Sequence, residues 1–306
     1  MKRGTKLVAR TFVSITGATT VALLLQGCPE QPEIQCSFAR GPFSARYTLV
    51  ERNGTCDGVP EMVGEIIGVE QYFAEKSGKK ADLSKPSVAL QSDTMGTLAV
   101  ERGGNTNPDL KLYALGALNS PDPAGNFCSV GSLNPAQLEL AEVLPDAGSD
   151  PDGGAPGDAG DPDASDDASV GEDDAGSDAA PEDAAQEPSG EPAVSMRYDW
   201  SNVRFLVRPE IPGQAFDADL TITLNGCATR YRVNAISYPK YWAEPLCAPT
   251  DPDSGQIGEA DDARCAPYAN PELGLEVGSQ INPRFKTRCE PETKYCVLVD
   301  EVSNYQ

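Results

Sequence analysis

The chain has 306 residues, with 24 Lys and Arg against 47 Asp and Glu, and it contains no histidine. A net charge of −23 argues against nucleic-acid binding, because phosphate contacts need clustered basic side chains. The lack of histidine excludes Ser-His-Asp and Cys-His catalysis and histidine-ligated metals. We therefore expect a non-catalytic protein without a cofactor.

The start of the chain has the pattern of an export signal. Four basic residues and no acid precede a mostly apolar stretch of 15 residues, Thr11 to Leu25. A signal peptide needs roughly 7–15 apolar residues, whereas a membrane-spanning helix needs about 20. Residues 1–27 are therefore predicted to be a signal peptide.

The run Leu25-Gln26-Gly27-Cys28 resembles the bacterial lipobox, in which Leu stands three residues before an invariant Cys. The resemblance implies cleavage before Cys28, a diacylglycerol group on its thiol and acylation of its freed amine. Two or more acyl chains anchor a protein stably to a membrane. Pro29 stands where Asp would resemble an inner-membrane retention signal, which favours the outer membrane. An ordinary secretory signal with a chance Cys is the alternative.

The cysteine count agrees with export. Nine cysteines are present, and lipidation of Cys28 leaves an even number, which is typical of disulfides in an oxidising compartment. The absence of C-x-x-C spacing argues against a zinc site, and scattered buried thiols are the alternative to disulfides. The disulfide candidates are Cys36, Cys56, Cys128, Cys227, Cys247, Cys265, Cys289 and Cys296.

An acidic segment divides the mature chain. Residues 145–192 hold 16 acids, no Lys or Arg and no aromatic residue, and Val170 is their one β-branched aliphatic side chain. Such a sequence cannot bury enough apolar surface to offset its ordering entropy, so a disordered linker is expected. Residues 28–144 and 193–306 are then the two halves of the folded body.

Cysteine parity predicts a disulfide across this linker. The first half keeps three cysteines after lipidation and the second half has five, so at least one pair must join the halves. Cys36 and Cys56 bracket one strand and are expected to pair locally. Cys128 is then expected to reach the second half, with Cys227 as the favoured partner. This parity favours one β-rich body over two domains.

The first half shows short strand patterns. Strands are expected at 46–51, 63–69, 88–90 and 112–118, with an Asn-Gly turn at Asn53-Gly54. Residues 92–103 suit a helix capped by Ser92 or Asp93 and stopped at Gly103. A polar loop is expected at 76–85, and Asn134-Pro135 is expected to open a helical turn.

The second half shows longer alternation of apolar and polar residues. Residues 203–207, 220–224 and 231–235 alternate with period two, which predicts strands with one buried face. Asn225-Gly226 joins two of them and is a strong hairpin signal. Residues 296–299 are a candidate last strand. The fold class is therefore mainly β, an antiparallel sheet or sandwich with few short helices and disulfides.

Two features are candidates for binding. Tyr238, Tyr241 and Trp242 follow a predicted strand, and aromatic side chains on a loop can bind a glycan or peptide, although they can also cap the core. The aromatic residues Tyr198, Trp200 and Tyr231 have the same two interpretations, ligand binding or capping of the core. The acidic loop from Asp251 to Asp262 suits calcium poorly, because a calcium hand needs Gly where Gln256 stands, so it reads better as a solvated loop.

A catalytic motif is hard to find. Ser77-Gly-Lys-Lys80 fits S-x-x-K, but its companion S-D-N and K-T-G elements are missing. A buried carboxylate pair in a cleft would be the remaining route to an enzyme.

Short segments in both halves resemble uncharacterised lipoproteins of myxobacteria: Tyr47–Val50, Gly64–Val69, Tyr113–Gly116, Trp200–Arg204 and Ile281–Pro283. This resemblance implies no activity, but it does imply that the two halves form one unit. The sequence therefore predicts a lipid-anchored, non-catalytic protein of the cell envelope with a structural or protein-interaction role. A binding module for a glycan, peptide or calcium is the alternative.

Overall fold

The computed structural model describes residues 35–53, 56, 58–144, 190–237, 247–251, 253–276 and 278–305. The lipobox with Cys28, the acidic segment 145–189 and the aromatic side chains of Tyr238, Tyr241 and Trp242 lie outside the described residues. The predictions made for them stay predictions. Within the described ranges, no helix has both the length and the apolar composition needed to cross a bilayer.

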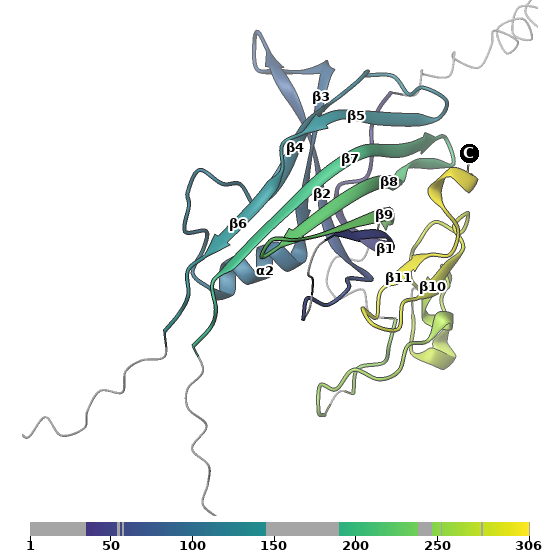
Figure 1. Cartoon of the computed structure of the whole chain (residues 1–306). Helices are drawn as coiled ribbons and strands as arrows, with labels where there is room; N and C mark the ends of the chain where they lie inside the picture. Colours follow the sequence, from purple (N-terminus) through teal and green to yellow (C-terminus); the bar gives the residue numbers. More distant parts are fainter. Residues whose placement is uncertain are drawn as a thin grey trace, which may run out of the picture.

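The body is built on one antiparallel sheet of nine strands, which confirms the predicted mainly β fold (Figure 1). Along the sheet the order is β5-β4-β3-β2-β1-β9-β8-β7-β6. The strands are β1 (Gly41–Asn53), β2 (Gly64–Lys76), β3 (Lys80–Ser92), β4 (Tyr113–Leu118), β5 (Phe127–Leu133), β6 (Ala136–Leu140), β7 (Val194–Arg208), β8 (Ile211–Leu224) and β9 (Cys227–Ser237).

The sheet closes on itself. The second half of β7 pairs with β5, with Phe127 opposite Leu206, while its first half pairs with β6, with Leu138 opposite Met196. Because β5 also pairs with β4, the two ends of the sheet meet. Closure satisfies the backbone groups that an open sheet would expose at its edges.

The strands that follow the acidic segment form one block, β9-β8-β7, which is flanked on both sides by strands that precede it. β1 pairs with β9 over most of its length, from Phe43 opposite Ser237 to Asn53 opposite Ala228. On the other side, β5 and β6 pair with β7. The two halves of the chain therefore share one sheet and one interior.

The strand alternation sorts side chains between two apolar clusters. In β7, Phe205 and Val207 point into the closed sheet, whereas Leu206 points outward into a second cluster. Phe38, from the segment before β1, stacks on Phe205 with ring centroids 4.0 Å apart. The segment carrying Phe38 therefore lies against the interior at the end of the sheet where β7 finishes.

Two turns bear on the predictions. The expected hairpin at Asn225-Gly226 is confirmed, since both residues have the positive φ that this turn requires, 50° and 85°. The expected loop at 76–85 is wrong: β2 and β3 extend through it as a hairpin in which Lys76 pairs with Lys80. Polar side chains are tolerated there because this end of the hairpin is exposed to solvent.

The predicted helix is confirmed as α2 (Asp93–Glu101), whose start is capped by the Ser92 side chain. The Ser92 hydroxyl accepts a hydrogen bond from the Met95 N–H at 3.1 Å. The helical turn expected at Asn134-Pro135 is wrong, because these residues lie between β5 and β6. Proline lacks an N–H and so suits a break between strands as well as a helix start.

The C-terminal segment covers part of the outer face of the sheet (Figure 1). Its side chains, among them Ile281, Phe285 and Leu298, pack against Leu206 and Ile236 of the sheet. It contains β10 (Thr287–Cys289), β11 (Cys296–Leu298) and the 3-10 turns η1 (Asp262–Cys265), η2 (Pro271–Leu273) and η3 (Val302–Tyr305). The predicted last strand is confirmed as β11.

Four disulfides are present: Cys36–Cys128, Cys56–Cys227, Cys247–Cys289 and Cys265–Cys296. The expected bridge between the two halves is confirmed, and so is Cys227 as its partner in the second half, but its partner in the first half is Cys56 and not Cys128. Cys36 and Cys56 stand at opposite ends of β1, which spans roughly 40 Å when extended, whereas a disulfide needs Cα atoms about 5–6 Å apart. Cys36 therefore pairs with Cys128, and Cys56 makes the crossing bridge.

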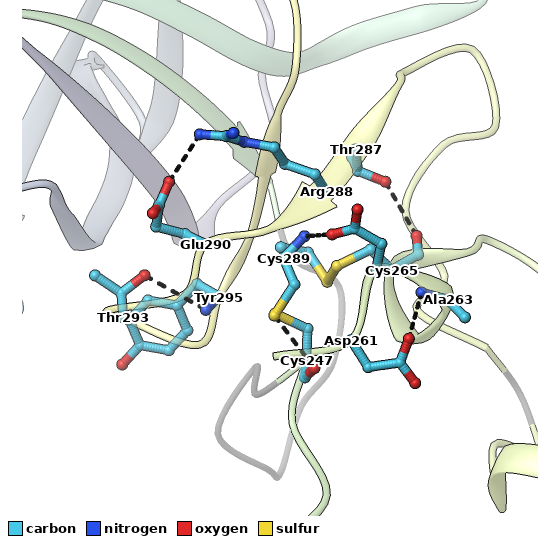
Figure 2. Close-up of a disulfide and its surroundings, with 12 residues drawn as sticks. Cys247, Asp261, Ala263, Cys265, Thr287, Arg288, Cys289, Glu290, Thr293 and Tyr295 are labelled. Atoms are coloured by element: carbon cyan, nitrogen blue, oxygen red, sulfur yellow. Dashed lines mark hydrogen bonds and ion pairs between the residues drawn. A yellow bond between two sulfur atoms is a disulfide. The ribbon is translucent and has the colours of Figure 1, made fainter. Parts of the chain in front are cut away.

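The other two disulfides lie side by side in the C-terminal segment (Figure 2). The Cys289 N–H donates to the Asp262 carboxylate at 2.7 Å, and the Thr287 hydroxyl donates to the Cys265 carbonyl at 3.1 Å. These bonds fix η1 against β10. The segment is therefore held by covalent links and local hydrogen bonds as well as by its apolar contact with the sheet.

Candidate functional site

An apolar pocket opens at the end of the closed sheet where β8 turns into β9. Its volume is about 340 Å³. Its walls come from the segment before β2, from α2 and from the ends of β7, β8 and β9. The lining residues are Val59, Pro60, Met62, Thr94, Leu98, Val194, Met196, Ile222, Leu224, Asn225, Cys227, Thr229 and Tyr231.

Aliphatic side chains line both the buried part and the partly exposed part of the pocket. Met196 and Ile222 are buried, and they continue the interior of the sheet to the pocket wall. Nearer the opening, Met62, Leu98 and Leu224 are half-buried and pack against the same core. The pocket is therefore a part of the interior that the fold leaves unfilled and open to solvent, which is the common form of a small-molecule site.

A few polar atoms interrupt this lining. The Tyr231 hydroxyl accepts a hydrogen bond from the Met62 N–H at 3.2 Å, which fixes the segment before β2 over the pocket. Thr229, also buried, has its hydroxyl 3.8 Å from the Cys227 sulfur. Asn225 lies at the rim, where its side-chain oxygen accepts from the Ser195 N–H at 2.8 Å. Such sparse polar groups orient a ligand more than they attract it.

A buried carboxylate lies beside the pocket. Glu65 of β2 is 5% exposed, and it accepts hydrogen bonds from the Tyr47 hydroxyl at 2.6 Å and the Thr94 N–H at 3.2 Å. The Ser92 hydroxyl is a third donor. Burial and the Glu65 charge raise the pKa of Tyr47 well above its usual value, and burial followed by the same charge does so for Tyr198. This network ties α2 to the sheet.

The rim of the pocket is held by two further links. The Cys56–Cys227 disulfide joins the segment after β1 to the start of β9. At the end of α2, Arg102 donates to the Ala141 carbonyl at 2.8 Å and forms an ion pair with Glu191 at 2.7 Å. The helix is thereby tied to both ends of the acidic segment.

The acidic segment leaves and rejoins the body at one point next to the pocket. Val143 and Glu191 exchange two backbone hydrogen bonds, at 2.8 and 2.9 Å. Val194, three residues after Glu191, already lines the pocket. The two described ends of the acidic segment therefore lie close to the pocket.

A second, polar groove of about 490 Å³ lies over β7, β8 and β9. Its charged side chains are paired with each other or with neighbours. The Arg204 guanidinium binds Asp217 at 2.6 and 2.8 Å, and Asp219 accepts from the Asn202 amide at 2.6 Å and pairs with Arg232 at 3.6 Å. A ligand here would have to compete with these contacts.

The acidic loop predicted as a weak calcium candidate uses its carboxylates locally. Asp251 accepts from the Asp253 and Ser254 N–H groups, both at 2.9 Å, and these bonds lower its pKa. Asp261 accepts from the Ala263 N–H at 2.9 Å and so caps η1 (Figure 2). In the described part of the chain, the one group of three side chains close enough to share a metal is Cys247, Cys265 and Cys296, which are in disulfides.

The other sequence candidates separate in space. Tyr198, Trp200 and Tyr231 are buried in the core, as the capping alternative expected, although Tyr231 also reaches the pocket. The S-x-x-K stretch at Ser77 lies in the exposed β2–β3 turn. Sequence reasoning missed the pocket, because its lining residues follow the same strand alternation as the filled core. A weak signal was Leu98, an apolar residue on the helix.

Comparison with known proteins finds one matching family and a relative that is similar over nearly the whole chain. The model of the MlpA family matches residues 41–239, which is the closed sheet together with the acidic segment. A Myxococcus xanthus protein named "Putative lipoprotein MlpA" is 25% identical over 314 residues, covering 99% of this chain and 100% of that protein. No solved structure matches the chain.

Proposed function

This chain belongs to the MlpA family, and from that premise we propose that it is a lipid-anchored, non-catalytic binding protein of the cell envelope. The apolar pocket at the end of the closed sheet is its binding site. The observation that carries this proposal is an aliphatic pocket of about 340 Å³ that is open to solvent. Exposed apolar surface of this kind is stabilised when a ligand displaces its water.

The anchor is supported by the sequence and by the relative. The lipobox at Leu25–Cys28 follows a basic and apolar start, and the Myxococcus xanthus relative is named as a lipoprotein. Cys28→Ala is expected to abolish incorporation of a labelled fatty acid and to leave the precursor uncleaved. Equal labelling of this variant would contradict the anchor.

A non-catalytic role is supported by the environment of Glu65. Among mechanisms open to a chain without histidine, glycoside hydrolysis would need a pair of free carboxylates. The buried neighbours Asp217 and Asp219 are already engaged, the first by Arg204 and the second by Asn202 and Arg232. Glu65 accepts hydrogen bonds from the Tyr47 and Ser92 hydroxyls and from the Thr94 N–H, and these donors surround a single buried carboxylate. We therefore assign Glu65 to holding α2 on the sheet.

The sequence left two roles open, a structural or protein-interaction role and a binding module. The pocket lining favours the binding module. A purely structural role needs no open pocket. A glycan would require aromatic platforms and many hydrogen-bonding groups, and calcium would require several oxygen ligands. The lining residues are mostly Val, Leu, Ile and Met, so the ligand is apolar.

The test uses the mature chain with Cys28→Ser and a fluorescent probe with an aliphatic tail, 6-dodecanoyl-2-dimethylaminonaphthalene. Leu98→Gln on α2 should weaken probe binding about tenfold, because it replaces apolar contact at the pocket wall. The matched control is Val100→Gln on the same helix, where the side chain is 83% exposed and outside the pocket lining. Equal affinity for both variants, or no binding by the parent chain, would refute the proposal.

A further inference from the structure

We infer that the pocket takes a linear aliphatic chain of about a dozen carbons whose head group, uncharged or cationic, stays at the opening. This inference deepens the proposed function and rests on it. It is carried by three observations: the shape and chemistry of the lining, the size of the cavity, and the charges around the opening.

The lining suits a flexible chain better than a rigid ring system. Two methionines, Met62 and Met196, face the cavity together with Leu98 and Leu224. Methionine and leucine side chains adapt to a ligand by changing rotamer, and methionine does so most readily. Tyr231 is the one aromatic residue of the lining, and its hydroxyl is engaged by the Met62 N–H. A stacking platform for a planar ligand is therefore missing from this pocket.

The size sets the length of the chain. The cavity measures about 340 Å³. A protein cavity of about 150 Å³ accommodates benzene, with six carbons. Scaling by volume gives room for about a dozen carbons. A longer chain would leave its additional methylenes in water.

The charges around the opening select the head group. Glu61 and Asp93 are exposed next to the lining residues Met62 and Thr94, and the acidic segment joins the body beside Val194. The basic side chains next to the lining residues have partners. Arg102 pairs with Glu191 and Arg197 pairs with Asp199, both at 2.7 Å, and Arg230 stands opposite Glu51 in the pairing of β1 with β9. Arg52 donates to the Cys56 and Val59 carbonyls. An anionic head group would therefore be repelled over distances of about 8 Å at physiological salt.

The tail enters the pocket because the lining is mainly aliphatic, whereas a polar head group keeps its hydration at the opening. Asn225 stands at the rim, where it can hydrogen-bond a head group, whereas Met196 and Ile222 lie buried at the inner wall. Withdrawing each methylene from water favours binding, so affinity should rise about fourfold per carbon until the cavity is full. This dependence on chain length distinguishes insertion of a tail from adsorption at the surface.

The experiment is displacement of 6-dodecanoyl-2-dimethylaminonaphthalene from the mature Cys28→Ser chain, with all ligands below their micelle concentrations. 1-Octanol, 1-decanol, 1-dodecanol and 1-tetradecanol test length. Dodecyltrimethylammonium and dodecanoate test the head group, and phenanthrene tests a rigid ligand of similar carbon number. We expect affinity to rise from octanol to dodecanol and then level off. Dodecanoate should bind about tenfold more weakly than dodecanol at low salt, with a smaller difference in 0.5 M NaCl.

Two variants test whether the dependence on chain length arises in the pocket. Leu98→Trp fills the pocket wall and should move the optimum to a shorter alcohol, whereas Val100→Trp on the exposed face of α2 should leave it unchanged. Deletion of residues 148–189 removes most of the acidic segment and should reduce discrimination against dodecanoate.

The outcomes separate the two proposals. If the probe binds in the pocket but phenanthrene displaces it better than any alcohol, or if chain length has no effect, the aliphatic-chain inference is overturned and the proposed function stands. Equal binding of dodecanoate and dodecanol at low salt overturns the head-group selection. Failure of the probe to bind, or insensitivity to Leu98→Gln, overturns the proposed function itself.

Discussion

At the scale of single residues, Glu65 shows what sequence reasoning could not reach. It stands in β2 among apolar neighbours, and one acid among 47 Asp and Glu gives no local sign of burial. Its burial depends on Tyr47 and Ser92, which come from two other strands and are brought together by the closed sheet. The pocket residues were hidden for a related reason, since an apolar side chain on a strand has the same pattern whether its space is filled or empty.

Glu65→Gln is expected to destabilise the protein by about 1–3 kcal/mol, because the amide presents N–H groups to donors that already point at the carboxylate. The measurement is the free energy of unfolding in urea. Glu70→Gln is the control in the same strand: Glu70 pairs with Arg40 at 3.3 Å and is 43% exposed, so its loss should cost less than about 1 kcal/mol. Equal losses for the two variants would contradict the buried network.

At the scale of elements, the strands with clear alternation were predicted well. The hairpin at Asn225-Gly226 and the helix capped by Ser92 follow from local chemistry that needs no partner strand. The closure of the sheet through β5 and β7 could not be predicted, because that pairing joins residues far apart in the chain. The length of β1 also determines which cysteines can pair, because the extended strand holds Cys36 and Cys56 too far apart to form a disulfide.

The crossing disulfide predicts how the cleaved protein behaves. After proteolysis within the acidic segment, the two halves should stay joined under denaturing conditions until a reductant is added, because Cys56–Cys227 links them. Gel electrophoresis with and without reductant reads this out. Replacing both Cys56 and Cys227 by Ser should release the halves without reductant.

The matched control replaces the other pair of the first half. Cys36 and Cys128 both precede the acidic segment, so their replacement by Ser should leave the halves joined. Separation in this control, or retention in the Cys56/Cys227 variant, would show a different pairing.

At the scale of the whole molecule, the acidic segment is an insertion into a body that is already complete. The prediction of one β-rich unit rested on cysteine parity, and the pairing of β1 with β9 and of β5 with β7 now gives it a structural basis. Parity worked because it depends on cysteine counts, whereas the choice of partners depends on geometry that the counts do not contain.

Deletion of residues 148–189 is expected to leave the melting temperature of the mature chain unchanged or slightly higher. Each halving of a flexible loop recovers only about 0.6 kcal/mol of closure entropy, and the body keeps its strand pairings. Differential scanning calorimetry gives the comparison. A clear fall in Tm would mean that the segment packs on the body.

The backbone bridge between Val143 and Glu191 makes the acidic segment a suitable site for inserting another protein domain. An inserted domain needs its two termini close together. Val143 and Glu191 face each other in the bridge, so the Cα atoms at the two points of insertion are roughly 5 Å apart. Covalent continuity across the junction is backed by Cys56–Cys227, so strain from a large inserted domain would not separate the halves. Replacing the acidic residues with an enzyme or an epitope would thus turn this protein into a display scaffold.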